Sequence, residues 1–267
     1  MLAMKNSCYL RDIIFWEANP CGPDNTDSNA SGSLDRAALC VKEFFQTSSV
    51  HQNEVDLVVL ATQAFTSDGP LKQAHNIIMD NHYNVKFNQR VLFENGLVNI
   101  QLHGCYTLVS GDWLSALRIA RNFSFAENLN NILVIVIDDP YEDDESQSSD
   151  MHIAVFCISQ ESIKGWQLVD LKQYEIDDDI PPELTANVDK QFALGQTGME
   201  QCKIHHFLLD TGNSFIHPGE NGILLREGNL LSSLRALTES NTTSRSVTQV
   251  SHRCYSQMTI ASFLNIS

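Results

Sequence analysis

The sequence has little positive charge. It contains 17 Lys and Arg residues against 33 Asp and Glu residues, which gives a formal net charge of −16 at pH 7 over 267 residues. Nucleic-acid backbones and anionic membrane surfaces are also negative and would repel such a protein. We therefore expect no nucleic-acid partner and no membrane partner.

The sequence also lacks paired cysteines and long apolar runs. Its seven cysteines include no Cys-x-x-Cys pair, and an odd, scattered set is typical of reduced thiols, so we expect a cytoplasmic protein. No apolar run approaches the ~20 residues that span a membrane, and the N-terminus carries charges where an export signal is apolar.

Patterns typical of metal sites are scarce as well. Cys202 lies near His205 and His206, but a strand would point adjacent histidines to opposite faces. The acidic segments lack the spaced Asp, Asn and Gly of a calcium loop and are typical of solvated surface. We expect no metal and no cofactor.

Alternating helical and strand patterns fill the first half of the chain. The hydrophobic content of 43% is enough for one large core or two fused ones. Helical periodicity predicts helices, and β-branched apolar runs predict buried strands joined by crossovers in a mainly parallel sheet. The predicted helices are Leu34 to Thr47 and Leu71 to Asp80, and the predicted strands are Val55 to Ala61, Val98 to Leu102 and Ile132 to Ile137.

Two further strands are predicted to close this half near residue 170. Ile153 to Ile158 and Trp166 to Leu171 follow an acidic loop and are expected to form an antiparallel pair. We therefore divide the chain into residues 1–170 and 171–267. Periodicity is weaker in the second part, where we expect a helix over Leu224 to Leu237 and a short strand over Val247 to Val250.

The segment from Ser110 to Asp138 is the most informative part of the sequence. An apolar helix beginning after Ser110 leads directly into the strand Ile132 to Ile137. Free N–H groups and the helix dipole make the start of a buried helix positively polarised, which suits a nucleophile or an oxyanion. Ser110 therefore has two interpretations: a nucleophile, or an N-cap whose removal would cost roughly 1 kcal/mol.

These residues resemble those of the type III β-ketoacyl-ACP synthases of the thiolase superfamily. In that family a catalytic cysteine precedes a buried helix containing Ala-Leu-x-x-Ala, and an apolar strand follows. Here the helix contains Ala116, Leu117 and Ala120, the strand begins at Asn131, and Ser110 stands in the cysteine position. The resemblance covers roughly Leu34 to Ile158. It implies an α/β, thiolase-like fold of two related βαβαβ-type halves, with the second half truncated.

The sequence departs from the family pattern at several positions. Cys105 lies five residues before the nucleophile position, so we give it no catalytic role, and the glycine-rich turn of the family is replaced by Asp150 to Ala154. The family's His-x-x-Asn motif is echoed only by His217 and Asn221, and its Gly-Asn motif resembles Ser256 to Ser262, with Gln257 in place of Asn. We expect the chain to end before the strands that complete the second half.

The family's chemistry gives the catalytic interpretation. Its cysteine takes an acyl group from a thioester of CoA or acyl carrier protein. A serine is a weaker acid than a cysteine and needs an adjacent general base, for which His217 is the best candidate beside Gln257. Asp112, in the first helical turn, would oppose negative charge on Ser110. The resemblance therefore implies an acyltransferase acting on acyl thioesters in fatty-acid or polyketide-type biosynthesis.

A second interpretation is a catalytically inactive subunit that forms a heterodimer with an active condensing enzyme. The substituted cysteine, the altered glycine turn, Gln257 and the early end of the chain favour it. In both cases the resemblance implies a dimer, either with a second copy or with a ketosynthase-like chain.

Overall fold

The computed structural model describes most of the chain. The described residues are 7–17, 33–62, 85–106, 111–138, 152–161, 164–175, 205–210, 222–224, 230–239, 247–254 and 257–266. The predicted helix Leu71 to Asp80 and the candidate residues Ser110 and His217 lie outside them. No described helix is long and apolar enough to cross a membrane.

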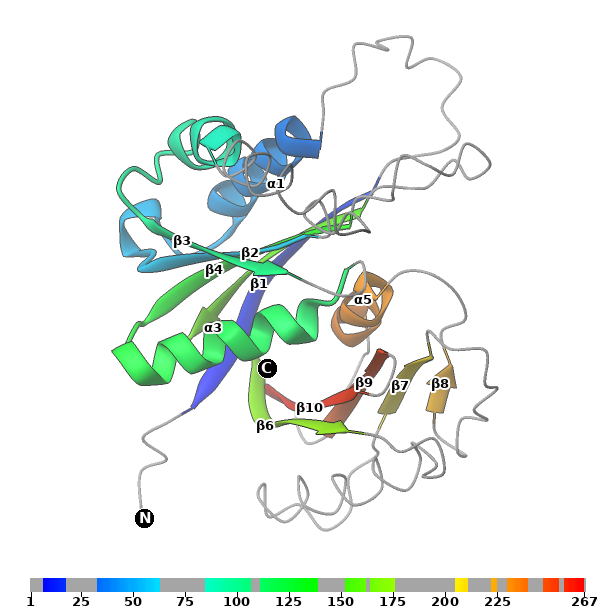
Figure 1. Ribbon diagram of the computed structural model, residues 1–267. Helices are drawn as coiled ribbons and strands as arrows, with labels where there is room; N and C mark the ends of the chain where they lie inside the picture. Colours follow the sequence, from blue (N-terminus) through cyan, green and yellow to red (C-terminus); the bar gives the residue numbers. More distant parts are fainter. Residues whose placement is uncertain are drawn as a thin grey trace, which may run out of the picture.

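The described strands form one ten-stranded sheet in the order β3-β2-β4-β5-β1-β6-β10-β9-β7-β8 (Figure 1). The strands are β1 (Cys8–Glu17), β2 (Leu57–Thr62), β3 (Gln101–Tyr106), β4 (Asn131–Asp138), β5 (His152–Ser159), β6 (Gly165–Glu175), β7 (His205–Asp210), β8 (Gly222–Leu224), β9 (Val247–Cys254) and β10 (Gln257–Ile266). The helical elements are α1 (Ser33–Thr47), the 3₁₀ helix η1 (Gln52–Glu54), the π-helix η2 (Asn88–Phe93), α3 (Trp113–Glu127) and α5 (Leu231–Glu239).

The sheet consists of two related halves. Read from its outer strand inward, the first half has the order β3-β2-β4-β5-β1 and the second has β8-β7-β9-β10-β6. When the strands of each half are numbered along the chain, both halves therefore have the same spatial order: third, second, fourth, fifth and first strand. In each half the second strand pairs in parallel with the third and fourth, and the fifth pairs antiparallel with the fourth and first. The expectation of an α/β chain with two related halves is confirmed.

The second half is the smaller one. Its third strand β8 has 3 residues against 6 in β3, and its helix α5 has 9 residues against 15 in α3. It nevertheless has all five strand positions, so the terminal strands that we expected to be missing are present as β9 and β10. The division at residue 170 stays a prediction; that residue lies inside β6.

The predicted antiparallel pair after the acidic loop is wrong. Both predicted strands exist as β5 and β6, but β1 lies between them and pairs with each. Gly165, at the start of β6, allows this arrangement, because a Cβ there would come within 2.8 Å of the Leu10 carbonyl oxygen on β1. The N-terminal strand was not predicted, because nothing local in the sequence shows that a distant segment inserts between two neighbouring strands.

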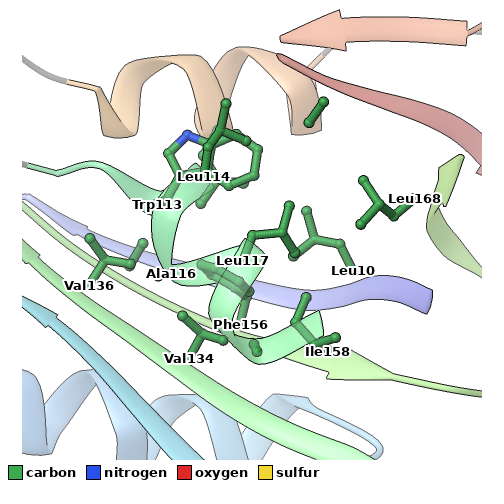
Figure 2. Packing of buried hydrophobic residues seen from close by; sticks show 14 of the residues in the cluster. Leu10, Trp113, Leu114, Ala116, Leu117, Val134, Val136, Phe156, Ile158 and Leu168 are labelled. Carbon is green, nitrogen blue, oxygen red and sulfur yellow. The ribbon is translucent and has the colours of Figure 1, made fainter. Parts of the chain in front are cut away.

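Two helical layers cover the first half-sheet. On one face, α1 and η2 pack against β2, β4 and β5 around Val41, Phe44, Val91 and Leu133. On the other face lie α3 and α5, between the two half-sheets (Figure 1). The main core is here, and the buried side of α3 packs through Trp113, Leu114 and Leu117 against strands of both halves (Figure 2). The sequence-based prediction of a buried core helix leading into a buried strand is confirmed.

Candidate functional site

Helix α3 begins two residues later than the sequence interpretation assumed. Asp112, not Ser110, is the N-cap, and its carboxylate accepts a hydrogen bond from the Ser115 backbone N–H at 3.3 Å and another from the Ser115 hydroxyl. Gly111 precedes it with φ 71°, a left-handed conformation that glycine adopts readily. The alternative in which Ser110 caps this helix is therefore wrong, because the cap position is occupied by Asp112.

Asp112 is paired with a histidine from the other half of the molecule. The Nδ1 atom of His252, on β9, lies 2.9 Å from Asp112 Oδ1, and both side chains are buried. Burial alone would raise the pKa of Asp112. The hydrogen bond and charge of His252, together with the hydrogen bonds from Ser115, outweigh burial and hold this pKa below its ordinary value. Asp112 is thus a carboxylate and accepts the Nδ1–H of His252.

A serine of α5 completes the hydrogen-bond chain. Ser233 Oγ lies 2.8 Å from His252 Nε2 and 2.6 Å from the Leu230 carbonyl oxygen, and it accepts a hydrogen bond from Trp113 Nε1 at 2.9 Å. When the ring is neutral, the Ser233 hydroxyl donates to Nε2; when the ring is protonated, Nε2 donates to Ser233 and the hydroxyl donates to Leu230. The contacts accommodate both states of the ring.

The four residues Trp113, Asp112, His252 and Ser233, which we call the inter-half network, join α3 of the first half to α5 and β9 of the second. Their order of contacts, hydroxyl to imidazole to carboxylate, is that of a serine–histidine–aspartate triad. Ser233 is 0% exposed and His252 is 2% exposed, however. A substrate cannot reach a nucleophile that is fully covered, so the geometry favours a role in joining the two halves.

The structure places one of the three candidate residues from the sequence. Gln257 is exposed at the start of β10, and its Oε1 accepts a hydrogen bond from Gln173 Nε2 at 2.7 Å. Ser110 and His217 lie outside the described residues, so the proposed set of Ser110, His217 and Gln257 stays a prediction. The sequence also contains the dipeptide Gly228-Asn229, which has the two residues of the family's Gly-Asn motif and is separated from the start of α5 by Leu230. Helix α5 occupies the place in the second half that α3 occupies in the first.

Of the inter-half network, Asp112 could be predicted from the sequence and His252 could not. Asp112 is an N-cap residue type directly before the apolar helical pattern, which was a sufficient signal for the cap. His252 had none, because no local pattern marks a histidine on a strand as the partner of a residue 140 positions away.

The buried thiols are not alternative nucleophiles. Burial raises the pKa of Cys8, Cys40 and Cys157 to about 12, so these thiols stay protonated and unreactive near neutral pH. Among the described residues no group of three His, Cys, Asp or Glu side chains is arranged to hold a metal ion.

The fold matches that of solved condensing enzymes. No protein-family model and no curated protein matches the sequence. The structure of 3-oxoacyl-(acyl carrier protein) synthase III, FabH, from Pseudomonas aeruginosa PAO1 matches with a TM-score of 0.59 and 13% identity, covering 97% of this chain and 98% of that one. AbyA1, a tetronic acid condensing enzyme, matches with a TM-score of 0.57 and 13% identity, covering 96% of this chain and 100% of that one.

A third match is the ishigamide ketosynthase/chain length factor, with a TM-score of 0.55, 13% identity and coverage of 86% of this chain and 80% of that one. At such low identity these likenesses show the fold. The chain therefore has the thiolase-like fold of the type III β-ketoacyl synthases and related ketosynthases, in a strongly divergent sequence.

Proposed function

We propose that this chain is a catalytically inactive ketosynthase-like subunit that forms a heterodimer with an active condensing enzyme. The observation that carries the proposal is the Asp112 carboxylate at the N-terminus of α3, paired with His252. In the related enzymes the nucleophile stands beside this helix end, where positive polarisation favours a developing negative charge. In this chain a buried carboxylate already takes that favourable position.

The effect on Ser110 is unfavourable for catalysis. Two peptide units separate Ser110 from Asp112, so their Cα atoms are at most about 7 Å apart. The Asp112 carboxylate is therefore close enough along the chain to oppose a negative charge on the Ser110 oxygen. A serine hydroxyl is already a weak acid and needs a base to become a nucleophile. His252 does not supply that base in this geometry, because both of its ring nitrogens are engaged inside the protein.

The sheet offers a surface for a partner. Strand β3 is the outer strand of the first half and, among the described strands, pairs only with β2. Within the described residues no strand pairs with its other edge, and natural proteins rarely leave such an edge uncovered. The resemblance to the thiolase superfamily implies that the central strands of two subunits pair across a twofold axis. The matched ketosynthase/chain length factor supports a partner of the ketosynthase type.

A second candidate function is acyl transfer from thioesters of CoA or acyl carrier protein. The register that places Ser110 in the nucleophile position favours it, with His217 and Gln257 as the proposed assisting residues. One matched protein, CsyB, was solved in complex with CoA-SH, and its two CoA-SH complexes match with a TM-score of 0.52 and 12–13% identity. The two candidates differ in whether Ser110 becomes acylated and in whether the chain needs a ketosynthase-like partner, and both can be measured.

The deciding experiment combines acylation and association. The full chain is incubated with acetyl-, malonyl- and longer acyl-CoA and with acylated carrier protein, and its intact mass is recorded beside that of Ser110→Ala. We expect no mass increase on either protein. In parallel, the chain is co-expressed with any ketosynthase-like protein that the neighbouring genes encode, and the mass of the purified protein is measured by light scattering. We expect a one-to-one heterodimer.

The outcomes separate the two candidates. An acyl adduct that Ser110→Ala abolishes would establish the second candidate and overturn the first. Absence of a heterodimer would overturn the proposed subunit role, because this role needs the partner.

A further inference from the structure

We draw no further inference here: the strongest candidate, the groove of about 640 Å³ between the outward face of α1 and the residues Gln52, Glu94 and Asn95, has a mixed polar and apolar lining, and nothing in the structure shows what covers it.

Discussion

Strands β4 and β9 occupy the same place in the two halves, yet their side chains differ in kind. Each has eight residues and follows the core helix of its half, and its last residue pairs with the first residue of the next strand. Position by position, Leu133 therefore corresponds to Gln249 and Val136 to His252. All four are buried. The first half fills these places with apolar groups, whereas the second half fills them with polar ones.

The difference shows that one backbone arrangement tolerates two kinds of interior. In β9, the polar side chain of His252 is fully engaged by Asp112 and Ser233. Two other polar side chains of β9 have no such partners. The Thr248 hydroxyl and both the nitrogen and the oxygen of the Gln249 amide are buried without a hydrogen-bond partner among the described residues. Unpaired buried polar groups are unfavourable by about 1–3 kcal/mol each. The second half is therefore expected to be the less stable one.

The largest effect should come from giving β4 the interior of β9. Leu133→Gln removes a fully buried apolar side chain and leaves an unpaired amide among the apolar residues under α1. Lost burial and the unpaired amide together should lower the free energy of unfolding by roughly 4 kcal/mol. Urea denaturation measures this change. A loss below 1 kcal/mol would contradict close packing of apolar side chains around Leu133.

A smaller loss is expected from breaking the inter-half network. His252→Leu leaves the Asp112 carboxylate buried without its partner, which typically costs about 3–5 kcal/mol. We expect the lower end of this range, because Ser115 still donates two hydrogen bonds to Asp112.

The matched control for His252→Leu is the double variant Asp112→Asn/His252→Leu. It carries no buried charge and should recover part of the loss. If the single and double variants were equally stable, the unpaired charge of Asp112 would not be the cause of the stability loss in His252→Leu.

This contrast between the halves also explains what could be predicted from the sequence. Continuous apolar runs identified β2, β4 and β5, and helical periodicity identified α1 and α3. In β9, Gln249, Ser251 and His252 interrupt the apolar pattern, so the strand was predicted only as far as Val250, four residues short of Cys254. The predicted helix Leu224 to Leu237 began too early, because Leu224 ends β8 and α5 starts at Leu231.

The candidate site was less predictable than the fold. The importance of the segment after Ser110 followed from the apolar helix and strand, but the contacts of Asp112 depend on a histidine from the opposite half. Such pairs are fixed by the way the halves pack, and periodicity records only which face of an element is buried.

The reverse exchange in β9 should stabilise the protein. Gln249→Leu replaces an unpaired buried amide with an apolar group of similar size, and we expect a gain of about 1–2 kcal/mol in the free energy of unfolding. Thermal unfolding of the full chain measures this gain beside Leu133→Gln. A clear loss of stability in Gln249→Leu would show that the amide has a polar partner, and the two halves would then differ less than proposed.

The smallest effect is the acid dependence of the inter-half network. The pKa of Asp112 in the folded protein lies below its ordinary value, so its contribution to stability is present above that ordinary value, near 3.8, and is lost as pH falls through the folded-state pKa. The slope for one such group cannot exceed about 1.4 kcal/mol per pH unit. Asp112→Asn keeps a good N-cap residue but cannot titrate, so the difference in unfolding free energy between it and the wild type should shrink as the pH falls from about 5 to about 3. Urea denaturation of both proteins between pH 3 and 5 measures this difference, and a difference that stays constant over this range would contradict the lowered pKa of Asp112.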